Sequence, residues 1–222
     1  MIESKPWNWK KVDNGYKENV WLEPCIESYY LIDRWKKQNK KDFLDIGCGL
    51  GRHTIQFAKS GFTTRAIDLS EYAIDNTRQW AESENLTVDF VQCDMLDLPY
   101  EKESIDCILC RNVISHTDTE GMKKIISKLY KILKKDGECF LTLGSKNADT
   151  FKDEKNIFVD ENTKLRMDEG PEKGVPHFYA DMEIIPELFN NFKIIYLAQV
   201  QDFEYEDEQY KSRWHYVMLI KK

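Results

Sequence analysis

The sequence predicts an α/β fold in which a mostly parallel β-sheet is covered by helices on both faces. From about Asp42 onward, short apolar runs alternate with longer amphipathic segments, which is the pattern of repeated βα units. The first apolar run leads into closely spaced glycines and then into a helical segment. The length of 222 residues suits one α/β domain with a sizeable core and is short for two.

Four strands and two helices come first. Strands are predicted at four short apolar runs, residues 43–46, 63–67, 87–92 and 105–110. The helix after the first strand covers about residues 51–59 and ends at Gly61, because glycine adopts the left-handed conformation that terminates helices. Ser70 is the predicted N-cap of the next helix, which extends to about Glu84.

A long irregular segment interrupts the second half of the pattern. A helix is predicted to start at Asp118 or Thr119 and to end with Gly137 at its C′ position, before a fifth strand over 138–144. The pattern then lapses for about thirty-five residues, a length typical of a lid or binding loop. A short helix and two strands joined by the acidic stretch 202–209 are predicted at 181–190, 192–200 and 214–220.

Residues 1–41 are predicted to form an N-terminal helical cover, and residues 42–222 the main domain with an insertion at about 145–180. Within the cover, Pro24–Lys37 has the pattern of an amphipathic helix with Tyr29, Tyr30, Ile32 and Trp35. Further aromatic residues precede this helix, namely Trp7, Trp9 and Trp21. Two interpretations remain open: the cover folds over a ligand as an apolar or cation–π wall, or it packs on the sheet edge.

Composition narrows the class of partner. The net charge is −7 and no long Lys/Arg tract occurs, so binding to nucleic acid is not expected. No apolar run is long enough for a membrane span, and the N-terminus lacks the apolar region of a secretory signal. The six cysteines lie mostly in strand-like runs, which favours core thiols in a reducing compartment. We therefore expect a cytoplasmic protein with a small-molecule partner. The sequence contains no feature that predicts its oligomeric state.

The most informative segment is the glycine loop. Gly47, Gly49 and Gly51 form G-x-G-x-G after a strand, with Asp45 two residues ahead of them. Dinucleotide folds use G-x-G-x-x-G and place a pyrophosphate on the helix N-terminus. The Asp45 carboxylate would repel such an anion and attract an ammonium or sulfonium group, which favours S-adenosylmethionine over a dinucleotide. The alternative is a tight β–α turn without a ligand.

Acidic residues also follow the next two strands. Asp68 lies about twenty residues beyond the loop, where a carboxylate can accept hydrogen bonds from a ribose diol. It could instead cap the helix that begins after Ser70. Asp94 follows the third strand, where it could accept from an adenine amino group while a neighbouring amide serves the ring.

Taken in order, five segments of the chain resemble the successive motifs of class I S-adenosylmethionine-dependent methyltransferases. These segments are 45–51, Asp68, 93–99, 106–116 and 136–138. The resemblance is nearest to the small-molecule branch of ubiquinone-biosynthesis and tellurite-resistance methyltransferases, and it covers residues 42–144 strongly and the C-terminal strands weakly. It implies a Rossmann-like sheet of seven strands, the last antiparallel, with S-adenosylmethionine as cofactor and S-adenosylhomocysteine as product.

The resemblance also implies a role for each motif. Asp45 and the glycine loop would hold the methionine part, Asp68 the ribose, and Asp94 with the Met95 amide the adenine. The full predicted cofactor-binding set is Asp45, Gly47, Cys48, Gly49, Gly51, Arg52, Asp68, Leu69, Asp94, Met95, Cys110 and Arg111. Arg52 and Arg111 could bind the methionine carboxylate or an acidic substrate, or be solvated surface charges.

Methyl transfer requires few catalytic groups on the substrate side of the site. A sulfonium methyl is already an electrophile, so alignment and exclusion of water suffice, and neither a metal nor a protein nucleophile is required. His116, after the fourth strand, is the predicted catalytic residue that orients or deprotonates the acceptor, although it could only hydrogen-bond around the next helix. Substrate contacts are predicted at Tyr29, Tyr30, His177 and Tyr179. Cys107 and Cys110 are not expected to share a metal, because residues three apart in a strand point to opposite faces.

The predicted function is therefore methyl transfer to a small molecule by in-line displacement. Two alternatives remain: a methyltransferase acting on RNA or protein, and an S-adenosylmethionine-binding protein without catalysis. The cover and the insertion would decide the acceptor, and neither contains a motif that specifies it.

Overall fold

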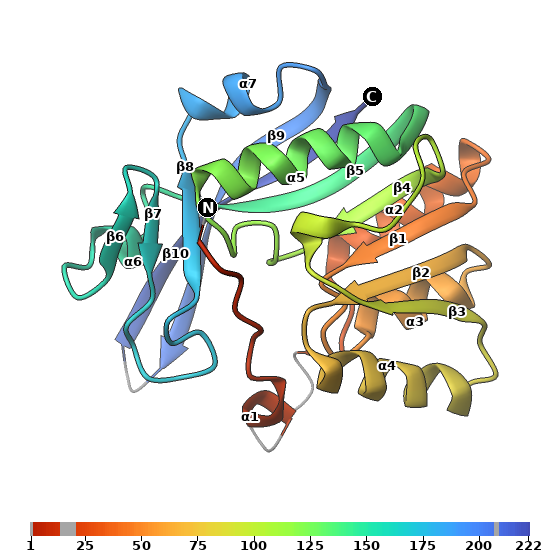
Figure 1. Cartoon of the computed structure of the whole chain (residues 1–222), viewed down its shortest axis with the longest axis horizontal. Helices are drawn as coiled ribbons and strands as arrows, with labels where there is room; N and C mark the ends of the chain where they lie inside the picture. Colours follow the sequence, from red (N-terminus) through yellow and green to blue (C-terminus); the bar gives the residue numbers. More distant parts are fainter. Residues whose placement is uncertain (1, 14–20, 207–208) are drawn as a thin grey trace.

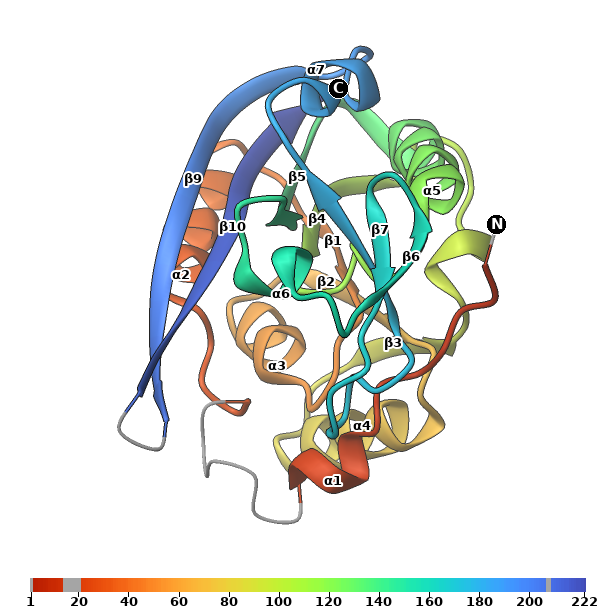
Figure 2. The ribbon, with the colours of Figure 1, turned by 90° about the vertical axis from the view of Figure 1, so that its left-hand side faces the viewer.

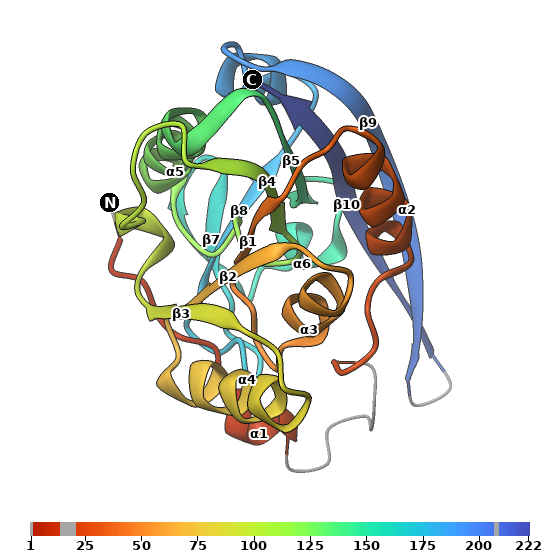
Figure 3. The ribbon, with the colours of Figure 1, turned by 90° about the vertical axis from the view of Figure 1, so that its right-hand side faces the viewer.

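The computed structural model describes residues 2–13, 21–206 and 209–222. Five parallel strands form the first part of its sheet, in the order β3-β2-β1-β4-β5 (Figure 3). They are β1 (Asp42–Ile46), β2 (Thr63–Asp68), β3 (Val88–Gln92), β4 (Ile105–Cys110) and β5 (Leu133–Ser145). Beyond β5, β10 (Gln209–Lys221) pairs antiparallel with β5, and β9 (Lys193–Glu206) pairs antiparallel with β10. These seven strands match the predicted Rossmann-like sheet, including its antiparallel last strand.

The insertion adds three strands, so the sheet has ten strands among the described residues and not seven. They are β6 (Ile157–Asp160), β7 (Thr163–Leu165) and β8 (Pro176–Ala180). β8 pairs in parallel with the end of β5 at Gly144 and Ser145, and β7 and β6 follow in antiparallel order. The pairing of β8 with β5 joins segments far apart in the sequence, which no local pattern signals.

Helices cover both faces of the sheet (Figure 1). The longer ones are α2 (Ile26–Lys37), α3 (Arg52–Lys59), α4 (Glu71–Ser83) and α5 (Thr119–Ile132). The short ones are α1 (Trp9–Asp13), α6 (Asp149–Lys152), α7 (Ile184–Leu188) and the 3-10 turn η1 (Met95–Asp97). One core cluster joins α2 and α3 to Cys107, and another joins α5 and α7 to Cys110, so these thiols lie on opposite faces as predicted.

The predicted helix ends are right at three places and wrong at one. The Ser70 hydroxyl accepts from the Ala73 N–H, the Asp118 carboxylate accepts from the Gly121 N–H, and Gly61 has φ +88°. Gly137, however, does not occupy a helix C′ position. α5 ends at Ile132, and Leu133, which is fully buried, already belongs to β5. Tertiary burial of this side chain draws the chain into the sheet earlier than the glycine signal suggests.

The C-terminal strands are also longer than predicted. β9 and β10 continue through most of the acidic stretch 202–209, with Asp202 opposite Arg213 and Phe203 opposite Ser212 (Figure 2). Phe203 is 62% exposed, because this end of the hairpin extends beyond the core. Gln201, Asp202 and Phe203 are all exposed, so buried and exposed side chains do not alternate along this part of β9.

α2 is anchored to the sheet by one polar contact set. The Trp35 indole N–H donates to Glu138 Oε2 at 2.8 Å, and Arg34 donates to both carboxylate oxygens of Glu138 at 2.8 and 2.7 Å. The buried side of α2 is Ser28, Leu31 and Trp35. Within the described ranges, no helix combines the length and apolar character needed to cross a membrane.

Candidate functional site

A cavity of about 910 Å³ lies at the carboxyl ends of the parallel strands. This is the edge of an open α/β sheet where ligands bind. We call one wall of the cavity, residues 47–50, 68–69 and 94–95, the floor. The opposite wall, residues 2–13 and 166–174, is the roof. Members of both groups line the cavity, together with the loop after β4 and the first part of β10.

The floor requires its glycines for close packing. Gly47 and Gly49 have φ values of +70° and +55°, which side chains other than glycine rarely adopt. A Cβ on Gly47 would lie 2.4 Å from Val113 Cγ2, and one on Gly49 would lie 2.6 Å from the ring of Trp9. The loop is held by the Ile67 carbonyl, which accepts from the Gly47 and Cys48 amides at 2.8 and 2.9 Å.

Asp68 lies at the cavity wall and is tied to the glycine loop. Its carboxylate accepts from the Gly49 N–H at 3.0 Å and from the Ser70 N–H at 2.8 Å. It does not cap the helix that follows, because Ser70 fills that position. The side chain is buried, and this burial raises the pKa of Asp68 above its ordinary value. Leu69 lines the cavity beside it.

Three members of the predicted cofactor set lie behind the floor and do not line the cavity. Asp45 is buried and accepts from Thr54 Oγ1 at 2.6 Å, and its burial raises its pKa to about 6. Cys110 is fully buried in the core, and Gly51 begins α3. These residues support the floor from beneath.

The segment that follows β3 places Asp94 and Met95 at the cavity. Asp94 caps η1, its Oδ1 accepting from the Leu96 N–H at 2.8 Å. Asp94 and Met95 both line the cavity, as the resemblance implies.

Arg52 and Arg111 both line the cavity, but their side chains make different contacts. Arg52 lies over the ring of Trp21, with 5.2 Å between its Cζ atom and the ring centre, and its Nη1 donates to the Glu23 carbonyl. Arg111 has Nη2 at 4.0 Å from a Glu27 oxygen. The Nε and Nη1 atoms of Arg111 are buried and have no hydrogen-bond partner among the residues that the structure describes. Buried donors without acceptors are costly, so a ligand acceptor at this wall would stabilise Arg111.

The roof joins the N-terminal segment of the chain to the insertion that follows β5. Trp7, Trp9 and Trp21 pack against one another, with ring centres 4.7 to 5.6 Å apart. The Lys5 ammonium donates to the Lys173 carbonyl at 2.6 Å, which ties the N-terminal segment to the insertion. Both interpretations of the cover therefore apply, to different parts of it: residues 2–13 fold over the glycine loop, and α2 packs on the sheet.

Tyr29 and Tyr30 are not brought to the cavity. They are 59% and 58% exposed and lie on the side of α2 opposite to Leu31 and Trp35. This position corrects the prediction that Tyr29 and Tyr30 contact the substrate. Residues three or four positions apart share one face of a helix, and Leu31 and Trp35 occupy the face of α2 that packs on the sheet.

His116, His177 and Tyr179 do reach the cavity. The rings of His116 and His177 have centres 4.7 Å apart, and Tyr179 Oη donates to Thr150 Oγ1 at 3.1 Å. Burial, assisted by the neighbouring His177, lowers the pKa of His116 to about 3. An imidazole with so low a pKa is a weak base at neutral pH, which favours orientation of a ligand over proton abstraction.

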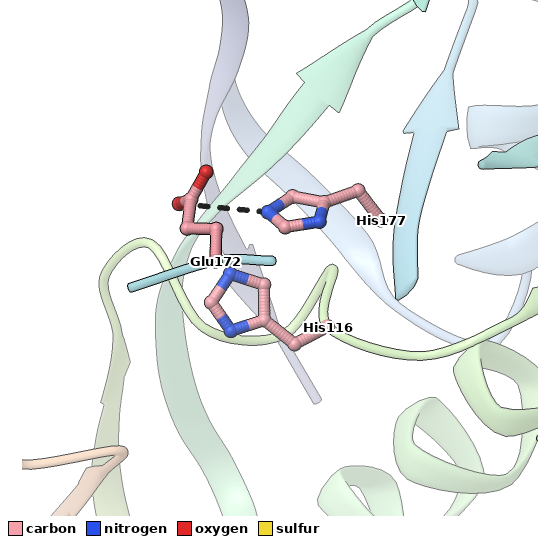
Figure 4. Close-up of side chains that lie close together, drawn as sticks. All are labelled: His116, Glu172 and His177. Atoms are coloured by element: carbon pink, nitrogen blue, oxygen red, sulfur yellow. Dashed lines mark ion pairs between the residues drawn. The ribbon is translucent and has the colours of Figure 1, made fainter. Parts of the chain in front are cut away.

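One functional candidate escaped the sequence analysis. Glu172, in the insertion, places Oε1 3.6 Å from His177 Nε2 (Figure 4). Its Oε2 lies 2.9 Å from Arg166 Nη1. Although burial opposes it, the contact with His177 lowers the pKa of Glu172 to about 2. Glu172 is one of several acidic residues in an irregular segment, so the sequence contains no signal that distinguishes it.

The fold and site together define a doubly wound α/β protein with a ligand cavity at the carboxyl edge of its sheet. Residues 43–137 match the methyltransferase domain family. Residues 43–137 are therefore similar to a methyltransferase domain, and the predicted resemblance to class I methyltransferases is confirmed for this segment and for the fold.

Two relatives and one solved structure illustrate the match. A putative methyltransferase of Geobacillus sp. is 32% identical over 108 residues, covering 48% of this chain and 43% of that protein. The ubiquinone biosynthesis O-methyltransferase of Actinobacillus pleuropneumoniae is 31% identical over 146 residues, covering 64% and 61%. The crystal structure of an S-adenosylmethionine-dependent methyltransferase from Clostridium acetobutylicum has a TM-score of 0.71 at 16% identity, covering 96% and 98%. The chain spans about half the length of the curated relatives it matches.

Proposed function

We propose that this protein transfers a methyl group from S-adenosylmethionine to a small-molecule acceptor by in-line displacement. The proposal rests on one observation, namely that Arg111 and Asp68 both line the same cavity. Arg111 offers two buried donors without partners, which suit the carboxylate of an amino acid. Asp68 offers an anchored carboxylate, which suits the hydroxyls of a ribose.

The other floor residues fit the remaining parts of the cofactor. Asp94 and the Met95 amide would contact the adenine, and the bare backbone of Gly47 and Gly49 would lie along the methionine part. Arg52 would add a second cation at the same end of the cavity. Asp45, buried behind the loop, would act on a sulfonium only through its charge.

When bound, S-adenosylmethionine supplies an electrophilic methyl group, so the residues of this chain have to align an acceptor and exclude water. His116, His177 and Tyr179 would orient the acceptor from the side of the insertion. The roof would exclude water, because its tryptophans and its hydrogen bonds to residues 171 and 173 close the cavity above the floor.

A small acceptor is favoured over a macromolecule. The roof covers the cavity with two segments of the chain that are bonded to each other, which leaves little room for a folded RNA or protein substrate. The ubiquinone biosynthesis O-methyltransferases among the relatives are named for a small-molecule pathway, which agrees with this choice. We include in the proposal a cytoplasmic location and the division into a cover, residues 1–41, and a main domain, residues 42–222.

Calorimetric titration with S-adenosylmethionine tests the cofactor assignment. We expect micromolar binding by the wild-type protein and a loss of about tenfold or more in Asp68→Ala, since charge-assisted hydrogen bonds contribute about 1.5–3 kcal/mol each. Asp89→Ala, an exposed carboxylate on β3, is the matched control and should bind normally. No binding by the wild-type protein would overturn the proposal.

Turnover needs a separate measurement. Formation of S-adenosylhomocysteine should be followed with a panel of small phenols, thiols and amines. Cofactor binding without product from any acceptor would support the alternative, a binding protein without catalysis.

A further inference from the structure

Three side chains that commonly ligate metals meet at the insertion side of the cavity. His116 comes from the loop after β4, Glu172 from the irregular part of the insertion, and His177 from β8 (Figure 4). One ligand atom from each lies within 4.8 Å of the other two. We call these residues the His–Glu–His cluster.

The spacing of the cluster is close to that of a metal site. Ligand atoms about 2.1 Å from a tetrahedral metal are about 3.4 Å from one another. His177 Nε2 and Glu172 Oε1 already lie 3.6 Å apart. A shift of about 1 Å in the position of the third ligand, His116, would complete the triangle at the bond lengths that zinc requires.

The surroundings of the cluster aim its ligand atoms inward. His177 Nδ1 lies 3.1 Å from the Val175 carbonyl and donates to it, which fixes the ring so that Nε2 is the nitrogen that faces Glu172. The other oxygen of Glu172 is held by Arg166. Such contacts behind the ligands are typical of metal sites, where they fix the imidazole tautomer and the carboxylate orientation.

His177 Nε2 and a carboxylate oxygen of Glu172 face each other at 3.6 Å, so either a proton on Nε2 or a cation between the two atoms stabilises the pair. His116 adds a third group at the same point, and its ring contacts the ring of His177. Three converging groups suit a metal ion better than a single proton, which two groups can share.

We propose that His116, Glu172 and His177 bind one divalent transition-metal ion that has open coordination positions toward the cavity. Two imidazoles and one carboxylate are a ligand set for Zn²⁺, Fe²⁺ or Co²⁺, whereas Mg²⁺ and Ca²⁺ prefer oxygen ligands. The metal would coordinate an oxygen or sulfur atom of the acceptor.

The role of the metal in catalysis rests on the proposed function. Coordination lowers the pKa of a hydroxyl or thiol, whose proton then leaves to solvent. The freed lone pair forms the new bond to the methyl carbon as the carbon–sulfur bond of the sulfonium breaks, and that bond's electron pair returns to sulfur. The acceptor class is therefore an alcohol, phenol or thiol. Metal binding itself does not depend on this reaction.

Metal titration of the untagged full-length chain, first freed of metal by a chelator, tests the site. Calorimetry with Zn²⁺ and visible absorption with Co²⁺ should show one ion bound per chain. His177→Ala and Glu172→Gln should each weaken metal binding by about tenfold or more. Removal of a residue that only supports a metal ligand already has an effect of about this size, so removal of a ligand should have at least as large an effect. His215→Gln and Glu169→Gln, a histidine and a carboxylate outside the cluster, should bind normally.

Two results would overturn the proposal: no Co²⁺ binding by the wild-type chain, or equal binding by the cluster variants. Thermal unfolding of the metal-free variants checks their folding, and Glu172→Asp, which keeps the carboxylate, should recover part of the affinity. Titration with S-adenosylmethionine separates the two proposals. Binding of cofactor without Co²⁺ refutes the metal site alone, and binding of Co²⁺ without cofactor refutes the proposed function alone.

Discussion

The floor and the roof of the cavity differ in how the chain builds them. The floor consists of short segments that follow β1, β2 and β3, so each residue is placed by the strand next to it in the sequence. The roof consists of residues 2–13 and 166–174, which are held together by hydrogen bonds between the N-terminal segment and the insertion. The comparison teaches that local structure places the floor residues, whereas the roof depends on contacts between segments distant in the sequence.

The largest effect is expected when the floor is broken. Gly47→Ala should weaken S-adenosylmethionine binding by at least about a hundredfold and destabilise the fold by about 3 kcal/mol, because left-handed backbone strain adds to overpacking. The new Cβ would lie 2.4 Å from Val113. Calorimetry and denaturant unfolding measure the two effects.

Gly61→Ala is the matched control for this substitution. Gly61 has φ +88°, but a Cβ there meets nothing within 4 Å. It should cost about 1 kcal/mol of stability from strain and leave cofactor affinity unchanged. If Gly47→Ala binds as well as Gly61→Ala, the close packing of the floor is not required for binding.

A smaller effect is expected at Arg111, on the wall between floor and roof. Arg111→Ala should weaken cofactor binding about 10–100-fold, the contribution of one or two charge-assisted hydrogen bonds. The protein should lose little stability, because Nε and Nη1 of Arg111 have no partner within the described ranges and Nη2 has only the 4.0 Å contact with Glu27. Arg78→Ala, whose side chain is 42% exposed on α4, is the calorimetric control. A stability loss without an affinity loss would contradict the ligand role.

The roof is tested by Trp9→Ala. Trp9 contacts Gly49 and two other tryptophans, so its removal should open the cavity and weaken cofactor binding about fivefold. Trp80→Ala on α4 should have no effect on affinity. Tighter binding by Trp9→Ala would mean that the tryptophan occupies space the cofactor needs, and the roof would then be a competitor of the ligand.

The smallest effect concerns His53, which connects the floor helix α3 to the cover. His53 Nε2 accepts from the Cys25 N–H at 3.1 Å, and burial lowers the pKa of His53 from 6.5 to about 3. The unfolded chain therefore binds more protons between pH 6.5 and 3, so stability should fall as the pH drops below 6.5, by up to about 1.4 kcal/mol per unit. Urea unfolding from pH 7 to 5 measures this slope. His53→Gln should have a shallower slope, and an equal slope would assign the effect elsewhere.

Most of the floor could be predicted from the sequence, and most of the roof could not. Strand β4 and the caps Ser70 and Asp118 are where the local pattern places them. The errors at Gly137 and in the stretch 202–209 arise where burial in the sheet or pairing between strands overrides a local signal. Glu172 was missed because its meaning depends on His116 and His177, which approach it only in the folded chain.

The sequence by itself determined the βα alternation, the glycine loop and the acids at successive strand ends, because each depends on residues a few positions apart. Only the tertiary structure decided which face of α2 is buried, how the insertion extends the sheet from Gly144 and Ser145, and that residues 2–13 close the cavity. These outcomes depend on contacts between segments from about thirty-five to more than a hundred and sixty residues apart, and such contacts have no local periodicity to reveal them.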